Sequence, residues 1–210
     1  MPLTSPDRPP DPVRQLSLFG AEAADPSVAD LAGLLAGPGE MVRMGGTARL
    51  SIVVDAAWRV HVLVAELARC GLAATWEATA DQQHRVRTSY ASTLAPLALA
   101  WLRDPPVGGG PVKQPPAGFH LNGRRLRLWV AAAGKSDPPG FLLRLGVHDE
   151  ACREPVGAAL AAVGLLAALL DAEAGGPAYR ITGRRRLARL ADLIGDPPAT
   201  APPLVWPHHP

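Results

Sequence analysis

The segment DLAGLLAGPG, residues 30–39, sets leucine and alanine side chains directly before a run of glycine and proline. It predicts a short helix over residues 28–35. This helix ends at Gly37-Pro38-Gly39, because these residues cannot continue a helix. The short helix opens a unit of alternating strands and helices.

The rest of this unit follows from apolar periodicity. Apolar and polar residues alternate over 41–44 and 47–55 on both sides of Gly45-Gly46, which indicates a hairpin with a two-residue turn. Val60, Leu63 and Leu67 share one face of a predicted helix over 56–70. The remaining predicted elements are strands at 73–79 and 84–89 and a helix at 92–102. The order is αββαββα over residues 28–103.

The same order recurs, in shortened form, after a linker rich in proline and glycine at residues 104–118. The second unit, residues 119–196, contains predicted helices at 124–133, 154–165 and 185–194 and predicted strands at 141–147, 169–174 and 178–182. An arm at 1–27 and a proline-rich tail at 197–210 are expected to be disordered. We therefore predict an α+β fold with two repeats, each an antiparallel sheet with helices on one face only.

Composition excludes several classes of protein. The 210 residues include 21 basic and 19 acidic side chains, so no overall positive charge indicates nucleic acid, and any such signal must be local. The longest apolar run, residues 155–170, is too short to span a membrane. Cys70 and Cys152 form no Cys-x-x-Cys pair and are expected to be reduced in the cytoplasm. The histidines have no spaced partners, so we predict no metal, no cofactor and no catalytic residue.

A local positive signal lies on the predicted strands. Neighbouring side chains on a strand point to opposite faces, so Leu50 and Ile52 point to the helices and Arg49 points away. The same reasoning assigns six arginines to the face without helices: Arg43, Arg49, Arg85, Arg87, Arg144 and Arg180. Glu77 is the clearest acidic residue of matching parity. Double-stranded DNA fits this pattern, because arginines neutralise its phosphates; the alternative is a solvated sheet that uses arginine for solubility.

The N-terminal arm carries one apolar cluster among its prolines, the pentapeptide Gln15-Leu16-Ser17-Leu18-Phe19. It resembles the bacterial sliding-clamp-binding pentapeptide. That resemblance implies that Gln15 forms a hydrogen bond at the mouth of the clamp groove, while Leu18 and Phe19 fill an apolar pocket. The alternative is that Leu16, Leu18 and Phe19 fold back onto the core of this protein.

The repeat order resembles a known family. Residues 30–39 resemble the motif helix of LAGLIDADG homing endonucleases, whose unit has the order αββαββα. The chain is more specifically similar to the actinobacterial WhiA group, which has two LAGLIDADG-like repeats without nuclease activity. The segments RRLRLWVAAAGKSDPP, residues 124–139, and TGRRRLARLADLIG, residues 182–195, are similar to parts of the second WhiA repeat. The resemblance covers residues 28–196 and implies a pseudo-dimer in which two curved sheets form a saddle.

The chain departs from the family where the nuclease members carry their chemistry. Those members have an acidic residue at the penultimate position of each motif helix, and the two carboxylates hold divalent metals. Here that position is Pro38 in the first repeat, and the second motif helix ends in Ala133-Gly134-Lys135. Glu40 or Asp137 could substitute only from beyond the helix ends. WhiA proteins also carry a C-terminal helix-turn-helix domain, and this sequence ends in its proline-rich tail without one.

We therefore predict a non-catalytic bacterial DNA-binding accessory protein, nucleoid-associated in the cytoplasm and recruited to the sliding clamp for DNA replication or repair. A further replication, repair or transcription protein is an additional candidate partner. One alternative is a WhiA-like regulator that acts through protein partners. The other is a metal-dependent endonuclease with displaced carboxylates.

Overall fold

The computed structural model describes residues 25–104 and 109–208. The first unit contains η1 Val28–Leu31, α1 Ala32–Ala36, β1 Glu40–Met44, β2 Thr47–Val54, α2 Ala57–Arg69, β3 Ala74–Ala78, β4 His84–Thr88, η2 Ser92–Leu94 and α3 Ala95–Trp101. Two short strands, β5 Leu102–Arg103 and β6 Val112–Lys113, flank the linker. The second unit contains α4 Gly123–Ala133, β7 Gly134–Asp137, β8 Gly140–Arg144, α5 Glu150–Ala162, β9 Ala168–Leu170, β10 Ala178–Thr182 and α6 Arg184–Ile194.

The two units have the same sheet topology. The strand order is β1-β2-β4-β3 in the first sheet and β7-β8-β10-β9 in the second, and all pairs are antiparallel. This identity confirms the predicted α+β fold with two repeats. The second repeat is not shortened, however, because β7 begins directly where α4 ends. Gly134 does end the helix, as its sequence indicates, but with extended backbone that continues as a strand of four residues.

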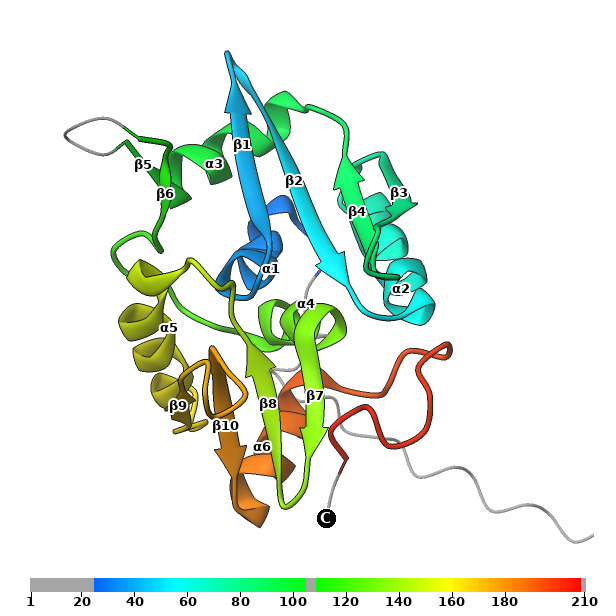
Figure 1. Cartoon of the computed structure of the whole chain (residues 1–210), viewed down its shortest axis with the longest axis vertical. Helices are drawn as coiled ribbons and strands as arrows, with labels where there is room; N and C mark the ends of the chain where they lie inside the picture. The colour runs from blue at the N-terminus through cyan, green and yellow to red at the C-terminus, as the bar shows by residue number, and fades with distance from the viewer. Residues whose placement is uncertain (1–24, 105–108, 209–210) are drawn as a thin grey trace, which may run out of the picture.

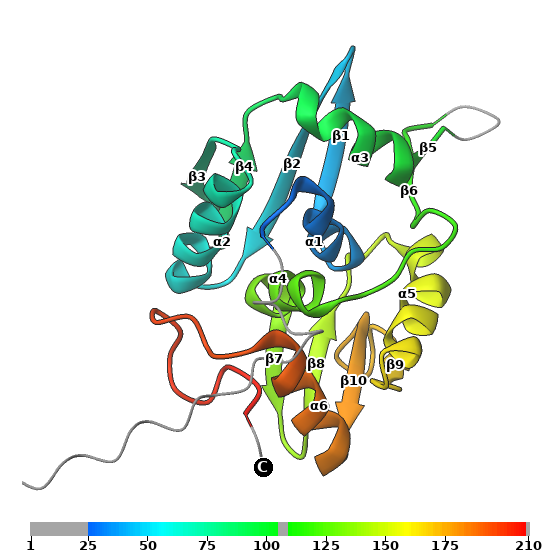
Figure 2. The same ribbon diagram turned by 180° about the vertical axis from the view of Figure 1, so that it is seen from behind.

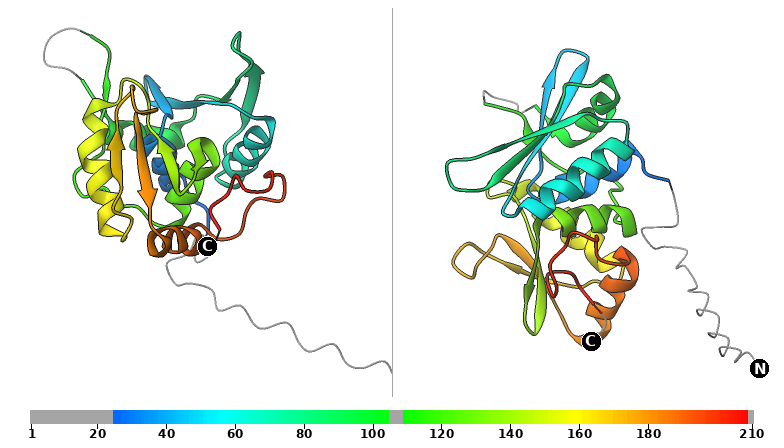
Figure 3. Two further views of the ribbon diagram at one scale, coloured as in Figure 1. Left: turned by 60° about the horizontal axis from the view of Figure 1, so that its bottom comes forward. Right: turned by 90° about the vertical axis from the view of Figure 1, so that its right-hand side faces the viewer.

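Each sheet is covered on one face only. Figure 1 looks onto the open side of both sheets, and Figure 2 shows the helices behind them. Helices α2 and α3 pack on the first sheet and α6 packs on the second, while α1 and α4 lie together at the junction of the units (Figure 3). None of the helices in the described part of the chain is long and apolar enough to cross a membrane.

The junction is a close helix contact. Leu34, Leu35 and Trp129 are completely buried there. A Cβ added to Gly33 would lie 2.6 Å from the carbonyl carbon of Arg125 in α4, and one added to Gly37 would lie 2.5 Å from a ring atom of Trp129. The glycines of the first motif helix therefore allow the two helices to approach until main chain meets main chain.

A cluster of charged side chains connects the two repeats on the helical side of this junction. Arg124 of α4 lies 3.4 Å from carboxylate oxygens of both Asp30 and Glu66, which belong to the first repeat. Glu66 also pairs with Arg69 at 2.6 Å. Asp30 and Glu66 are each only 7% exposed. Because these acidic groups are buried, they depend on the arginine of the other repeat for compensation.

The C-terminal tail differs from the disorder expected of it. Residues 197–208 form no helix or strand, but Trp206 is only 4% exposed. Its indole Nε1 donates to the carbonyl of Gly195 at 3.0 Å, and the guanidinium of Arg127 lies 5.1 Å from its ring centroid. Burial of one large tryptophan side chain stabilises the position of this proline-rich segment, which has no hydrogen bonds of a helix or a sheet.

We expect the substitution Gly33→Ala to lower the free energy of unfolding by about 1–3 kcal/mol, because the new methyl group forces α1 and α4 apart. Chemical denaturation of the purified chain measures this. Gly46→Ala is the control, since a Cβ in that turn would meet nothing within 4 Å. Equal stability of the Gly33 variant and the wild type would show that the two helices do not pack through this glycine.

Candidate nucleic-acid interface

Strand register defines the open face of the first sheet, since residues paired across antiparallel strands point the same way. Leu50 and Ile52 are buried against the helices, so Arg49 and Ser51 lie on the other side. Ser51 pairs with Arg87, and Val53 pairs with Arg85. The open face of this sheet is formed by Glu40, Val42, Met44, Thr47, Arg49, Ser51, Val53, Thr75, Glu77, Arg85 and Arg87.

The second sheet has a corresponding open face. Leu143 and Tyr179 are buried on its helical side, which leaves Arg144 and Arg180 on the open side. Lys135 of β7 joins them because it pairs with Leu142, which has the parity of Arg144. Sequence reasoning missed Lys135, since it did not recognise β7 as a strand.

Arg43 does not lie on the open face, and the prediction for this residue is wrong. It pairs with the fully buried Ala48 and forms an ion pair of 2.8 Å with Asp104, on the helical side. The prediction assumed that Val42 and Met44 point inward, but they are 44% and 58% exposed. The two-residue turn predicts the face of Arg43 correctly. Pairing outward from Gly45-Gly46 sets Met44 opposite Thr47, and this register determines the face of every residue in β1.

The open faces of the two sheets carry a modest positive charge. Their strands place three acidic side chains there, Glu40, Glu77 and Asp137, and six basic ones, Arg49, Arg85, Arg87, Lys135, Arg144 and Arg180, for a net formal charge of +3. Several of the charges compensate one another. Glu77 lies 3.5 Å from Arg85 and 2.5 Å from Arg87, and Asp137 lies 2.8 Å from Arg180.

A buried lysine from outside the helix caps the C-terminus of α1. The Nζ of Lys113 donates to the carbonyl oxygens of Gly37 and Gly39, both at 2.8 Å, and forms an ion pair of 2.5 Å with Asp149. Lys113 lies in β6, at the end of the linker. Its positive charge therefore stabilises the carbonyl end of the first motif helix, where the helix dipole is negative.

The C-terminus of α4 ends in the same way on Arg59 of α2. Its guanidinium donates to the carbonyl oxygens of Val130, Ala131 and Gly134 at 3.1, 2.8 and 2.6 Å. The Nε of Arg59 donates to Asp55 at 2.8 Å. Burial lowers the pKa of the Arg59 guanidinium, Asp55 opposes this shift, and nearby Arg144 adds to it. A cation from the first repeat thus satisfies the end of the motif helix of the second.

A pocket of about 260 Å³ opens where the ends of the two sheets meet. Both repeats line it, with Pro38, Val53, Val54, Asp55, Arg59 and Gln83 from the first and Ala132, Ala133, Gly134, Lys135, Arg144, Leu145 and Val147 from the second. Of the two residues considered as substitute metal ligands, Glu40 lies on β1 and Asp137 on β7, and neither lines this pocket. Among the described residues, no group of three or more His, Cys, Asp or Glu side chains could hold a metal ion.

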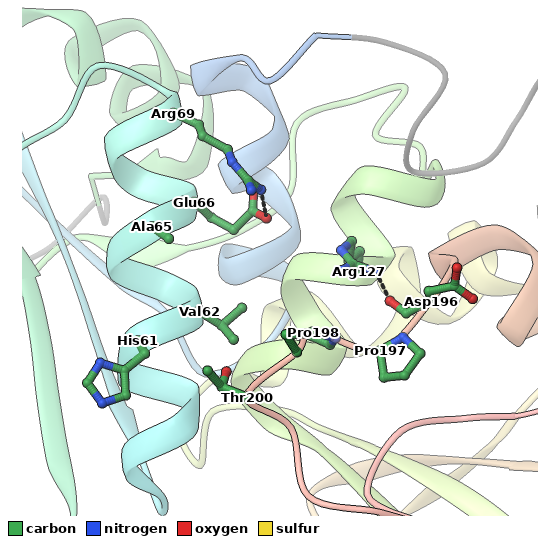
Figure 4. Close-up of a pocket in the computed structure, with 11 residues that line it drawn as sticks. His61, Val62, Ala65, Glu66, Arg69, Arg127, Asp196, Pro197, Pro198 and Thr200 are labelled. Atoms are coloured by element: carbon green, nitrogen blue, oxygen red, sulfur yellow. Dashed lines mark hydrogen bonds and ion pairs between the residues drawn. The ribbon is translucent and has the colours of Figure 1, made fainter.

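A second pocket, of about 400 Å³, lies on the helical side between α2 and residues 196–200 (Figure 4). His61, Glu66 and Arg69 line it from α2, and Arg127 lines it from α4. Arg127 donates to the carbonyl of Asp196 at 2.6 Å, which fixes the start of the tail beside the pocket. The polar groups of this pocket hold the tail and the charged cluster in place.

The proposed clamp-binding residues, Gln15 to Phe19, lie outside the described residues.

We expect the substitution Arg59→Met to lower the free energy of unfolding by about 1–3 kcal/mol, because it leaves buried carbonyl groups at the end of α4 without a donor. Arg185→Met on α6 is the control: its side chain is exposed, so it should cost less than about 1 kcal/mol. Equal losses for the two variants would contradict the role of Arg59 as a cap of the other repeat.

Two solved structures are similar to the chain. The structure of the homing endonuclease I-WcaI bound to its DNA recognition sequence matches with a TM-score of 0.56 and 12% identity, over 81% of this chain and 82% of that chain. The structure of I-DmoI in complex with DNA and Mn matches with a TM-score of 0.44 and 14% identity, over 81% and 99% of the two chains. No protein-family model and no curated protein matches the chain. The chain therefore has the fold of the LAGLIDADG homing endonucleases, with two repeats in one polypeptide.

Proposed function

We propose that this chain is a non-catalytic, DNA-binding accessory protein whose open sheet faces lie on duplex DNA while its N-terminal arm binds a bacterial sliding clamp. One observation carries the first part of the proposal. Two sheets turn uncovered, net positive faces to the same side of a fold that, in I-WcaI, is bound to DNA.

The charge pattern supports backbone binding rather than a merely soluble surface. The chain has a net formal charge of only +2, yet the open faces alone carry +3. The excess positive charge is thus concentrated on the uncovered side. A surface of this kind gains free energy from duplex DNA mainly by releasing counterions from the phosphates, a contribution that does not depend on base sequence.

The ends of the motif helices support a non-catalytic role. The carbonyl oxygens at the end of α1 accept hydrogen bonds from Lys113, and those at the end of α4 accept them from Arg59. Among the described residues, Asp55 is the one carboxylate that lines the pocket between them, and it is paired with Arg59. The residues present do not fit a divalent cation, since fixed positive charges already occupy the oxygens that a metal would need.

Recruitment to a clamp would make weak backbone binding useful. Binding through phosphates alone is salt-sensitive and does not select a site. A second, linked contact raises the effective concentration of the sheet faces at DNA that carries the clamp. The pentapeptide Gln15-Leu16-Ser17-Leu18-Phe19 supports this part of the proposal by its sequence. A replication or repair role follows from the clamp.

A WhiA-like regulator that acts through protein partners is the second candidate. One observation favours it: Val42 and Met44 are 44% and 58% exposed on the open face of the first sheet. These apolar side chains cannot form ion pairs or hydrogen bonds with a phosphate backbone. Exposed apolar side chains at such positions suit a protein partner.

We expect the double substitution Arg49→Glu and Arg87→Glu to weaken binding to all duplex sequences alike. The slope of log K against log salt should decrease in magnitude by about 2, because two phosphate contacts are lost. Fluorescence anisotropy with labelled duplexes measures both quantities. Arg153→Glu with Arg185→Glu makes the same change in net charge on helices α5 and α6 and should leave the slope unchanged. Equal slopes for the wild type and the Arg49 and Arg87 variant would remove the open face from the proposal. Binding of this face to a protein partner, without binding to DNA, would then favour the regulator.

We expect the double substitution Leu18→Ala and Phe19→Ala to abolish binding to a purified bacterial sliding clamp, because these side chains are the anchors of the pentapeptide. Surface plasmon resonance on immobilised clamp measures this. Leu3→Ala with Val13→Ala, two apolar residues of the same arm outside the pentapeptide, is the control. Retained clamp binding in the Leu18 and Phe19 variant would overturn the tether, and a lower melting temperature would instead place these side chains on the core of the protein.

A further inference from the structure

The pocket between the repeats has an unusual balance of charge. Three cationic side chains, Arg59, Lys135 and Arg144, line it together with a single carboxylate, Asp55. Arg59 forms its floor and is only 6% exposed, with its donors directed to Asp55 and the carbonyl groups of α4. The charge of Arg59 therefore reaches the pocket while its hydrogen bonds are used elsewhere.

Lys135 and Arg144 line the pocket and are both exposed. Lys135 pairs with Leu142 across β7 and β8, so Arg144 is its diagonal neighbour on the same open face. Neither side chain forms an ion pair with any residue in the described ranges, whereas Arg85, Arg87 and Arg180 of the open faces each do. Two neighbouring positive charges without an acidic partner repel each other. Their placement is explained if an anion binds between them.

The position and size of the pocket indicate which anion. Its lining includes Val53, Lys135 and Arg144 of the two open faces, so it lies at the junction of the sheets, where a bound duplex would cross from one repeat to the other. At about 30 Å³ for each water molecule, about 260 Å³ accommodates a phosphate group with several waters. Lysine and arginine side chains are the usual donors to such a group.

We propose that this pocket binds one backbone phosphate of the duplex through Lys135 and Arg144. The proposal rests on the proposed function, since it requires that duplex DNA lies across the open faces. It makes DNA binding independent of divalent cations, because the positive charge of the pocket belongs to the protein.

The first experiment measures duplex affinity by fluorescence anisotropy, at constant ionic strength, in EDTA and in magnesium. The double substitution Lys135→Gln and Arg144→Gln should reduce affinity on the order of tenfold, as expected for the loss of hydrogen bonds to a charged group. Arg85→Gln with Arg180→Gln is the matched control: it removes the same charge from open-face arginines that already have acidic partners, and it should reduce affinity less. The wild type should bind no better in magnesium than in EDTA.

The second experiment uses Asp55→Asn, for which the two interpretations of the pocket predict opposite signs. Removal of the carboxylate should strengthen duplex binding if a phosphate occupies the pocket. It should weaken binding, in magnesium only, if the pocket holds a metal ion, and that result would overturn the proposal. Melting temperatures of all variants verify that they are folded.

The outcomes separate this proposal from the proposed function. If the wild type does not bind duplex DNA, both fail. If the wild type and the control variant bind as expected but the Lys135 and Arg144 variant loses no more affinity than the control, only the pocket proposal fails. If inorganic phosphate binds to the wild type, measured by calorimetry, while the Lys135 and Arg144 variant retains full duplex affinity, the pocket is a site for free phosphate and the assignment to the backbone is overturned.

Discussion

The C-termini of α1 and α4 meet near the centre of this molecule, and two buried cations stabilise this arrangement by donating hydrogen bonds to the carbonyl groups there. Lys113 satisfies the end of α1, and Arg59 satisfies the end of α4. Each cation comes from a segment outside the helix it caps, since Lys113 lies in β6 and Arg59 in α2. Because buried carbonyl groups without donors are costly, neither helix end could lie here without its cation.

The close contact of α1 and α4 then sets the positions of the two sheets. Gly33 brings the main chains together, and Arg124 joins α4 to Asp30 and Glu66 of the first repeat. Since each sheet packs on helices of its own repeat, a fixed junction turns both open faces to one side (Figure 1). The saddle is thus a consequence of helix packing and of charge compensation behind it.

The same cations change what the junction can do. The residues that meet there bring positive charge to the ends of both helices, from Lys113 and Arg59. The modest charge of the open faces, reduced by Glu77 and Asp137, fits weak binding that gains from a second attachment point.

The sequence by itself determined the order of elements in the first repeat and the hairpin at Gly45-Gly46, because periodicity and turn residues are local properties. The tertiary structure alone decided to which face Arg43 points, because this depends on strand register. It also decided that Lys135 lies in a strand, because β7 forms only by pairing with β8. It also decided the roles of Arg59 and Lys113, whose hydrogen-bond partners lie more than 70 positions away in the chain. A side chain that caps a distant helix leaves no periodic trace in its own segment, so the contacts on which this fold depends appear only when the two repeats are packed together.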